Sequence, residues 1–355
     1  MKNLQATLIA MLLACAALSA CSGGGSDAAD DDPVNPGPGG PGPGPGPGPG
    51  PTPTVTIDPE NGFLVPGGTI EQQNVNTGSG VTRIAVGTSA TSTQINVDGE
   101  TRRYILLRPE ATLSNPPLLV MLHPSFTSSE TMANLTDVAD YALTQGFWVV
   151  LPQSNAGGWN DEAAAGRSDD VRFITLIIDT LAAQGSIDAN RVYATGFSSG
   201  GFMTQRLACD RSDKIAAFAI DGATMRNSLV ATCNPAVQRP KIYFLGNADL
   251  IVAYNGVFPE QANGQRSAAG TLAFWNDQQR CGGIVATTLP DRVIDGTRVQ
   301  RDQYTGCAGG TRLELYTIEG GGHGWPGGDA SFVGTTTQDI HATGLLWNFV
   351  SGFRR

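Results

Sequence analysis

The most constraining feature of this chain is a regular alternation of short apolar runs and helical periodicity from about residue 100 to residue 350. Two parallel strands need a crossover connection, usually a helix, so this alternation predicts an α/β fold with a mostly parallel central sheet flanked by helices. One helix is expected to open at Ser168, because two aspartates follow it and the apolar residues after them share one face. Another is expected over about 338–349. The predicted strands are Tyr104–Leu107, Leu118–Leu122, Trp148–Leu151, Arg191–Thr195, Ala216–Ile220, Lys241–Leu245 and Leu313–Ile318.

Residues 1–20 have the features of an export signal. Lys2 supplies a positive start, and the apolar run after it is too short to span a bilayer comfortably. The run ends in the motif LSAC at 18–21, which resembles the lipobox at which bacterial lipoprotein signals are cut. We therefore expect acylation of Cys21 and an exported protein, lipid-anchored to the cell envelope; Ser22 after the cysteine favours the outer membrane. The alternative is ordinary signal cleavage after residue 20, with the cysteine merely adjacent.

Residues 21–54 are expected to form a linker. Most of this stretch alternates glycine and proline, and proline removes amide donors while glycine adds conformational entropy, so no core can form there. The sequence therefore predicts a semi-extended spacer that leads to one large domain over 55–355. Within that domain, residues 55–95 are rich in Thr, Val and Gly, which indicates short strands or an extended lead-in without an assigned role.

The charge of the chain excludes one class of partner. The 22 basic and 32 acidic side chains give a formal net charge of −10, without a cluster of Lys or Arg. Because nucleic-acid phosphates are bound through a positive field, we expect no nucleic-acid partner.

Residues 196–200 read Gly-Phe-Ser-Ser-Gly and lie between a predicted strand and a helical pattern. This strand–turn–helix context is what a nucleophile elbow requires, with Ser198 as the nucleophile. The motif by itself is weak in a chain with 46 glycines, and the alternative is a Gly/Ser turn without chemical consequence. Its position after a buried strand is what favours the catalytic interpretation.

A serine hydroxyl needs a base, and the chain has three histidines. His123 ends an apolar strand and is expected to shape the turn there. His341 falls in the predicted final helix and is interpreted as a surface or packing residue. His323 lies in a glycine-rich segment, 320–328, that follows a late strand. We expect this segment to be a flexible loop and His323 to be the catalytic base.

The third member of a triad should be a carboxylate that follows a strand between the serine and the histidine. Asp249 meets this condition, since it comes four residues after the strand that ends at Leu245. It would fix the imidazole tautomer and stabilise the imidazolium. Asp221, which also follows a predicted strand, is the rival.

An oxyanion hole needs two backbone amides. The amide of Ser199, directly after the nucleophile, is the first candidate, and Ser125 is the second because the neighbouring Pro124 has no amide hydrogen. Trp159 and Trp325 are candidates for the wall of the substrate pocket; core packing is the alternative for both.

Four cysteines remain once Cys15 leaves with the signal and Cys21 takes the lipid, and they allow three pairings. Export to an oxidising compartment favours disulfides. The pairing of nearest neighbours, which closes two loops of similar size, is expected. A zinc site lacks both the CxxC spacing and an obvious histidine partner, so no metal is expected. The expected links are Cys209–Cys233 and Cys281–Cys307.

Four separated motifs resemble the polyhydroxybutyrate depolymerase family of esterases, which is related to the feruloyl and acetylxylan esterases of carbohydrate esterase family 1. The resemblance covers about residues 95–352 and departs at Pro124, where the family usually has glycine. The four motifs are the strand 118–123, the paired segments 168–174 and 187–193 that together lead to the elbow, the acid segment 246–256 and the histidine loop 321–327.

The resemblance implies an α/β-hydrolase that cleaves carboxylic esters through an acyl-serine intermediate, without a cofactor. Ser198 would attack, His323 would relay the proton and Asp249 would orient the imidazole. The substrate is expected to be a small or oligomeric ester; the alternatives are a depolymerase of solid polyester and a non-catalytic surface-binding lipoprotein that kept the fold. Because the resemblance runs almost to Arg355 and leaves no room for a polymer-binding module, soluble esters are expected to react faster than crystalline polyester.

Overall fold

The computed structural model describes residues 55–65, 70–155, 158–257, 264–328 and 334–355. The predicted export signal, Cys21 and the linker lie outside these residues. The described part contains a ten-stranded sheet with the strand order β12-β13-β14-β11-β10-β9-β7-β8-β6-β5. Its strands are β5 (Thr88–Val97), β6 (Glu100–Pro109), β7 (Leu118–Leu122), β8 (Trp148–Pro152), β9 (Val192–Phe197), β10 (Ala217–Asp221), β11 (Lys241–Gly246), β12 (Gly283–Thr288), β13 (Arg298–Thr305) and β14 (Leu313–Glu319).

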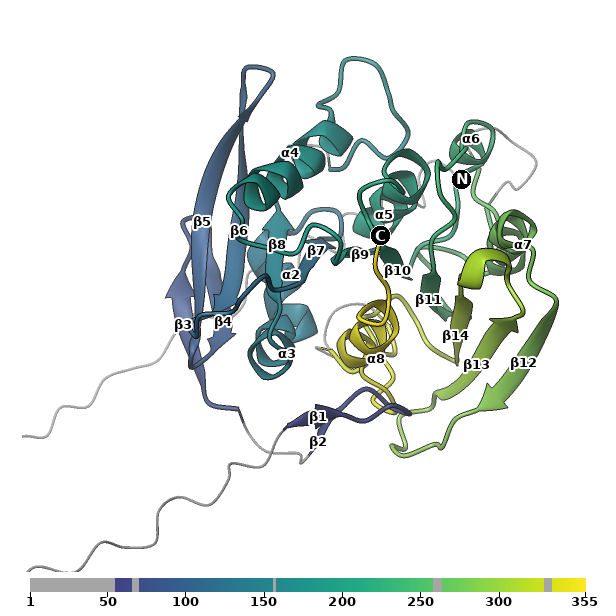
Figure 1. Cartoon of the computed structure of the whole chain (residues 1–355). Helices are drawn as coiled ribbons and strands as arrows, with labels where there is room; N and C mark the ends of the chain where they lie inside the picture. The colour runs from purple at the N-terminus through teal and green to yellow at the C-terminus, as the bar shows by residue number, and fades with distance from the viewer. Residues whose placement is uncertain (1–54, 66–69, 156–157, 258–263, 329–333) are drawn as a thin grey trace, which may run out of the picture. The chain divides into compact units, whose positions relative to one another are not determined.

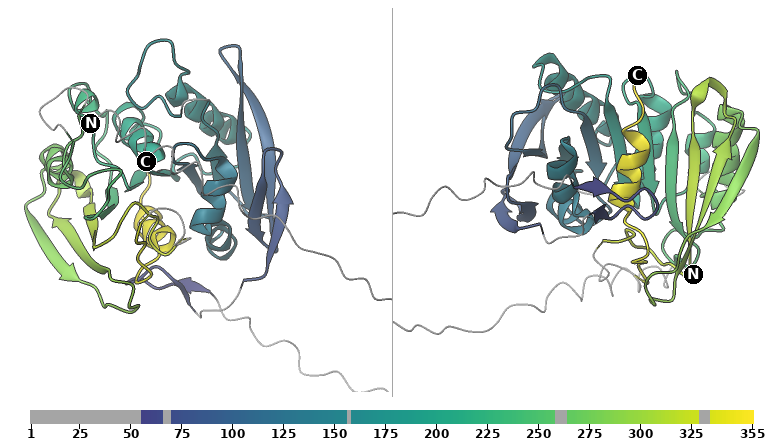
Figure 2. Two further views of the ribbon diagram at one scale, coloured as in Figure 1. Left: turned by 180° about the vertical axis from the view of Figure 1, so that it is seen from behind. Right: turned by 60° about the horizontal axis from the view of Figure 1, so that its bottom comes forward.

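The centre of this sheet is parallel. Strands β8, β7, β9, β10, β11 and β14 pair in parallel with their neighbours, whereas β6 and β5 at one edge and β13 and β12 at the other are antiparallel. Figure 2 shows these two antiparallel pairs at opposite ends of the sheet. Because the central strands run in one direction, the loops that follow them all leave at the same edge.

Helices cover both faces of the sheet (Figure 1). One face is buried by α2, α3 and α8, and the other by α4, α5 and α7. The short α6 and a 3₁₀ turn lie in the connections after β10 and β13. The helices are α2 (Ser129–Thr136), α3 (Val138–Gln145), α4 (Asp170–Ala183), α5 (Ser199–Asp210), α6 (Asn227–Val230), α7 (Ala268–Gln279) and α8 (Ala342–Val350), with the 3₁₀ turn at Ala308–Gly310.

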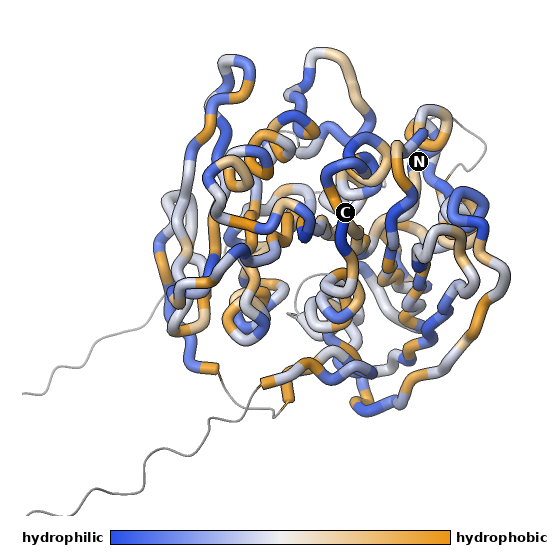
Figure 3. Tube along the Cα trace, in the orientation of Figure 1, coloured by the Kyte–Doolittle hydropathy of each residue, from blue (hydrophilic) through white to orange (hydrophobic). Residues whose placement is uncertain are grey.

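Two separate cores follow from the alternation of side chains along each strand. In β7, Leu119 and Met121 belong to the core under α2, α3 and α8, while Leu118, Val120 and Leu122 belong to the core under α4, α5 and α7. A strand buried on both faces is an almost continuous apolar run, which is why its sequence shows no polar alternation. The hydropathy colouring of Figure 3 marks the central strands as largely hydrophobic. This arrangement is the α/β-hydrolase class of fold that the sequence predicted.

All seven predicted strands are present. Six agree within two residues at each end, whereas the strand predicted as Tyr104–Leu107 is longer and begins four residues earlier, at Glu100. The expected lead-in contains two small antiparallel sheets, β1 (Thr56–Ile57) with β2 (Leu64–Val65) and β3 (Gln72–Asn76) with β4 (Val81–Ala85). The strand after them, β5, extends the main sheet, since it pairs along its whole length with β6. The sequence did not predict β12 and β13.

The prediction for the final helix was wrong at its start, because α8 begins at Ala342 instead of about 338. The Gln338 amide donates to the Asp295 carboxylate at 2.8 Å, and the Asp339 carboxylate accepts from the amides of Arg292 and Val293 at 2.6 and 2.9 Å. These bonds tie residues 338 and 339 to the turn before β13 and keep them out of the helix.

Two disulfides brace loops on the described chain. Cys209, at the end of α5, is bonded to Cys233 after α6, and Cys281, after α7, is bonded to Cys307 after β13. They close loops of 24 and 26 residues. In a chain-entropy treatment each stabilises the fold by about 3 kcal/mol, because it restricts the unfolded chain.

Candidate active site

Ser198 lies in a sharp turn between β9 and α5. Its φ of +55° and ψ of −119° are a conformation that non-glycine residues rarely adopt. The turn is held by backbone bonds on both sides: the Ser198 amide donates to the Asp221 carbonyl, and the Phe202 amide donates to the Ser198 carbonyl, each at 3.0 Å. The side chain is only 9% exposed. This geometry is that of a nucleophile elbow.

The glycines around the elbow permit very close backbone approach. A Cβ on Gly196 would lie 2.3 Å from the Gly200 carbonyl oxygen, and a Cβ on Gly200 would lie 2.1 Å from the Leu122 carbonyl oxygen. A Cβ on Gly201 would lie 2.7 Å from that of Ala223. Any larger residue would therefore separate the start of α5 from the ends of the neighbouring strands.

Asp249 and His323 form a buried pair at the same edge of the sheet. The Asp249 Oδ2 atom is 2.6 Å from His323 Nδ1, and the two residues are 6% and 4% exposed. The other carboxylate oxygen accepts from the amides of Ile251 and Val252 at 2.7 and 2.8 Å. These contacts hold the carboxylate in place and direct the imidazole so that Nδ1 carries the proton and Nε2 is the basic nitrogen.

The imidazole of His323 lies against the elbow. Its ring is tilted over Phe197, the residue before Ser198, with 4.8 Å between the ring centroids. On another side, the position that a Cβ of Gly222 would occupy is 3.2 Å from His323 Cε1. The structure thus brings together the predicted serine, acid and base, each at the end of a different parallel strand.

The rival carboxylate, Asp221, occupies a different position. It ends β10, is 2% exposed, and its main-chain oxygen accepts the Ser198 amide. Its side-chain Oδ2 has no hydrogen-bond partner within the described residues. The carboxylate that contacts the His323 imidazole is that of Asp249.

The loop after β7 carries the second predicted oxyanion donor. Ser125 is half-buried there, beside the elbow, because β7 pairs in parallel with β9. His123 shapes this loop, as expected from its place at the strand end: its Nδ1 donates to the Pro124 carbonyl at 2.8 Å, and its Nε2 accepts the Ser154 amide at 3.1 Å. Burial lowers the pKa of His123 to about 4, so the ring is neutral at physiological pH.

Part of this chain matches a known family of esterases. Residues 102–234 match the family model described as "Esterase PHB depolymerase", a segment that contains the elbow and ends before Asp249. Over this segment the chain is similar to the PHB depolymerase family of esterases.

Proteins that are similar in sequence to this chain carry different esterase names. The chain is 30% identical over 217 residues to feruloyl esterase B of Piromyces equi, which covers 58% of this chain and 39% of the fungal protein. It is 29% identical over 242 residues to poly(3-hydroxyalkanoate) depolymerase C of Paucimonas lemoignei, covering 61% and 57%. A solved structure, the acetyl xylan esterase from Aspergillus awamori, is 15% identical with a TM-score of 0.49 and covers 66% of this chain and 94% of that one. The chain thus spans less than two thirds of the length of both sequence relatives.

The two tryptophans predicted to line a pocket lie in the interior. Trp159 is 2% exposed, and its indole donates to the His123 carbonyl at 2.8 Å, which anchors the loop after β7. Trp325 is fully buried, and its indole donates to the Thr343 hydroxyl at 3.1 Å. The core-packing alternative describes the contacts of both rings.

Sequence reasoning missed two exposed apolar side chains on the loops that carry Ser125 and Asp249. Phe126, next to Ser125, is 94% exposed and has a φ of +60°, and Leu250, next to Asp249, is 88% exposed. Their loops follow β7 and β11, which lie on opposite sides of β9 in the sheet. The only signal in the sequence is the placement of a large apolar residue directly beside each predicted site residue.

Proposed function

We propose that this chain is a serine esterase that hydrolyses carboxylic esters through an acyl-serine intermediate. The observation that carries the proposal is the buried 2.6 Å contact between Asp249 and His323, whose imidazole packs against the elbow that carries Ser198. Serine, acid and base then follow one another along the chain in the order found in α/β-hydrolases. A non-catalytic binding protein would have no need of a strained serine or of a buried imidazole–carboxylate pair.

In the proposed reaction, Ser198 Oγ attacks the ester carbonyl carbon while His323 Nε2 takes the hydroxyl proton. The charge that develops on the carbonyl oxygen is stabilised by the amides of Ser199, at the start of α5, and Ser125. The tetrahedral intermediate collapses, the C–O bond to the alcohol breaks, and the imidazolium returns the proton to the leaving alkoxide. Water then attacks the acyl-serine by the same route and releases the acid, with Asp249 stabilising the imidazolium in both halves.

Turnover of a short p-nitrophenyl ester, followed by a fluorophosphonate and peptide mapping, tests this proposal. We expect hydrolysis, its loss on treatment with the phosphonate, and a phosphonyl adduct on the peptide that contains Ser198. Phosphonate-resistant turnover, or an adduct on another residue, would contradict the mechanism. A panel of feruloyl, acetylxylan and hydroxybutyrate esters then assigns the substrate class.

A second candidate function, hydrolysis of solid polyester, is favoured by the exposure of Phe126 and Leu250 on the loops that flank the elbow. Side chains that are already exposed can bury their apolar surface against an apolar solid without any rearrangement of the protein. This argument opposes the expectation, from the sequence, that soluble esters react faster. Product release from a polyester film and from soluble oligomers at equal enzyme decides between them. If the film is the substrate, the double variant Phe126→Ser, Leu250→Ser loses film release while soluble turnover persists.

The proposed location is the cell envelope, with a lipid on Cys21. The support is the lipobox-like motif at 18–21 and the long Gly/Pro-rich stretch after it. Among the described residues, none of the helices is both long and apolar enough to cross a bilayer. In a bacterial host, Cys21→Ser should move the protein from the membrane fraction to the soluble exported fraction. Continued membrane attachment of this variant would overturn the proposal of a lipid anchor.

A further inference from the structure

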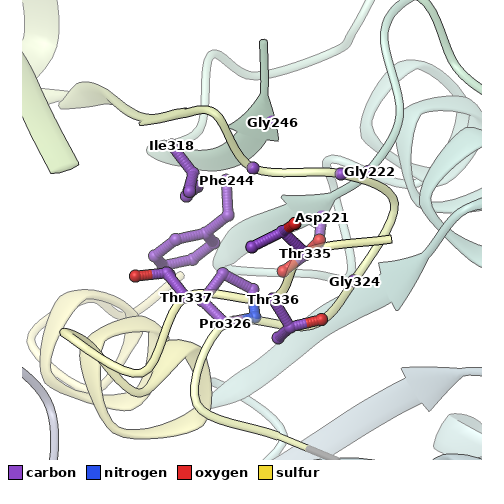
Figure 4. Close-up of a pocket in the computed structure, with 12 residues that line it drawn as sticks. Asp221, Gly222, Phe244, Gly246, Ile318, Gly324, Pro326, Thr335, Thr336 and Thr337 are labelled. Atoms are coloured by element: carbon purple, nitrogen blue, oxygen red, sulfur yellow. The ribbon is translucent and has the colours of Figure 1, made fainter. Parts of the chain in front are cut away.

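A small cavity lies beneath the histidine loop. Its volume is about 10 Å³, close to the space that one water molecule requires. Figure 4 shows Asp221 at the end of β10, together with Thr335 and Thr336 from the segment that follows the histidine loop, around this cavity. The remaining walls are largely glycine backbone and the side chains of Phe244, Ile318 and Pro326.

Two polar side chains on the wall of this cavity are unpaired. Within the described residues, neither Asp221 Oδ2 nor Thr336 Oγ1 has a hydrogen-bond partner, although the two residues are only 2% and 6% exposed. A buried polar atom without a partner is costly, and such atoms in proteins are usually satisfied by an ordered water. The cavity offers both the volume and the polar groups that such a water needs.

The environment of Asp221 favours its protonated form. Burial raises the pKa of this carboxyl well above its usual range, and the negative charge of Asp249 raises it further. The ionisable groups near Asp221 are Asp249, from the loop after β11, and His323, from the loop after β14, whose ring contacts the adjacent Gly222. A protonated carboxyl can donate a hydrogen bond, whereas an ionised one only accepts.

We propose that Asp221 is a positioning residue that shares one bound water molecule with Thr336 beneath the catalytic histidine. The bridge connects the two walls of the site. On one side, Asp221 holds the elbow through the bond from the Ser198 amide to its carbonyl. On the other, Thr336 packs against Gly324, where a Cβ would lie 2.1 Å from Thr336 Oγ1. The water thereby fixes the segment that follows His323 relative to the strand that supports Ser198.

The water itself is tested by a high-resolution crystal structure of the wild-type protein. We expect one ordered water within hydrogen-bond distance of both Asp221 Oδ2 and Thr336 Oγ1. A dry cavity, or a carboxyl turned to a different partner, would overturn the bridge whether or not the proposed esterase activity is correct.

The positioning role rests on the proposed function and is tested by kinetics. Asp221→Leu should lower kcat/KM by about ten- to a hundredfold, because the bridge is lost and the walls shift. Asp221→Asn should keep kcat/KM close to the wild-type value, in contrast to Asp221→Leu, because asparagine is neutral and can still hydrogen-bond to the water. If Asp221 is neutral, its asparagine variant should also move the acidic limb of the pH profile by less than about 0.3 pH unit.

If Asp221 were ionised, its negative charge would favour the protonated form of the catalytic base, so removal of that charge in Asp221→Asn would move the acidic limb to clearly lower pH. That shift, or failure of asparagine to restore the rate, would refute the positioning role. If Asp221→Leu does not fold, the asparagine profile and a crystal structure of Thr336→Val, in which the water should be lost, still decide the matter. Absence of any esterase activity in the wild type would instead refute the proposed function.

Discussion

Substitution of Gly200 by alanine tests how closely the elbow must approach the neighbouring strand. The added Cβ would lie 2.1 Å from the Leu122 carbonyl oxygen, 2.6 Å from its carbon and 2.8 Å from the His123 carbonyl oxygen. All three are backbone atoms, so no side chain can turn aside. An ordinary contact begins at 3.4 Å, so the start of α5 must move away from the end of β7 by more than about 1 Å.

This displacement has two expected effects. Overpacking should destabilise the fold by about 1–3 kcal/mol. Because Ser199 directly follows the nucleophile and Ser125 follows β7, the two proposed oxyanion amides should also separate, and a misplacement of about 1 Å lowers kcat/KM by about a hundredfold.

The assay is turnover of a p-nitrophenyl ester together with a thermal melt. Gly352→Ala is the matched control, because the Cβ there would meet its nearest atom at an ordinary 4.0 Å. A Gly200→Ala variant with wild-type rate and wild-type melting temperature would refute the packing argument.

The remaining predictions concern Asp249 and Glu130. Asp249→Asn should lower kcat by about 10⁴-fold without unfolding the protein, because an amide cannot hold the His323 tautomer in the same way; an unchanged rate would show that another carboxylate is the acid. Burial alone would raise the pKa of Glu130, but hydrogen bonds from Arg103, the Glu130 amide and Ser128, together with the charge of Arg103, outweigh it and lower this pKa from 4.5 to about 2. The stability that follows, about 3 kcal/mol, is present above pH 4.5 and lost as the pH falls towards 2. Melting temperatures between pH 5 and pH 3 should therefore fall less in Glu130→Gln than in the wild type, and equal slopes would contradict the assignment.

The central strands could be predicted from the sequence because they are buried on both faces. In β7 every residue is buried, and the sequence is an unbroken apolar run. Strands β12 and β13 could not be predicted in this way. Most residues of β12 are exposed, and β13 contains arginines, glutamines and an aspartate, so neither has the pattern of a core strand. They are strands because β13 pairs with β14 and β12 pairs with β13, and the pairing with β14 is a tertiary contact.

The glycines around His323 illustrate a different limit. The sequence suggested a flexible loop, yet His323 is buried and the glycines are closely packed. A Cβ on Gly321 would lie 2.3 Å from the Ile318 side chain, and a Cβ on Gly246 would lie 2.4 Å from the Gly321 carbonyl oxygen. Composition cannot distinguish glycine that confers freedom from glycine that permits close approach.

The choice between two carboxylates likewise required three-dimensional positions. Asp221 and Asp249 both follow strands of the parallel sheet, and the sequence kept both as candidates. Of the two, only Asp249 has its carboxylate 2.6 Å from the His323 imidazole. The turn after β11 holds it there through two hydrogen bonds from backbone amides. Differences of a few ångströms of this kind depend on loop conformation, which a strand pattern does not contain.

The central claim, that Ser198 is the nucleophile of an esterase, is tested most directly by Ser198→Ala. Turnover of a p-nitrophenyl ester should be abolished while the melting temperature stays close to that of the wild type, because the hydroxyl acts in the chemistry and contributes little to packing. Ser351→Ala, at an exposed serine that ends α8, is the control and should keep full activity. A folded Ser198→Ala variant that retains more than a small residual rate would contradict the account.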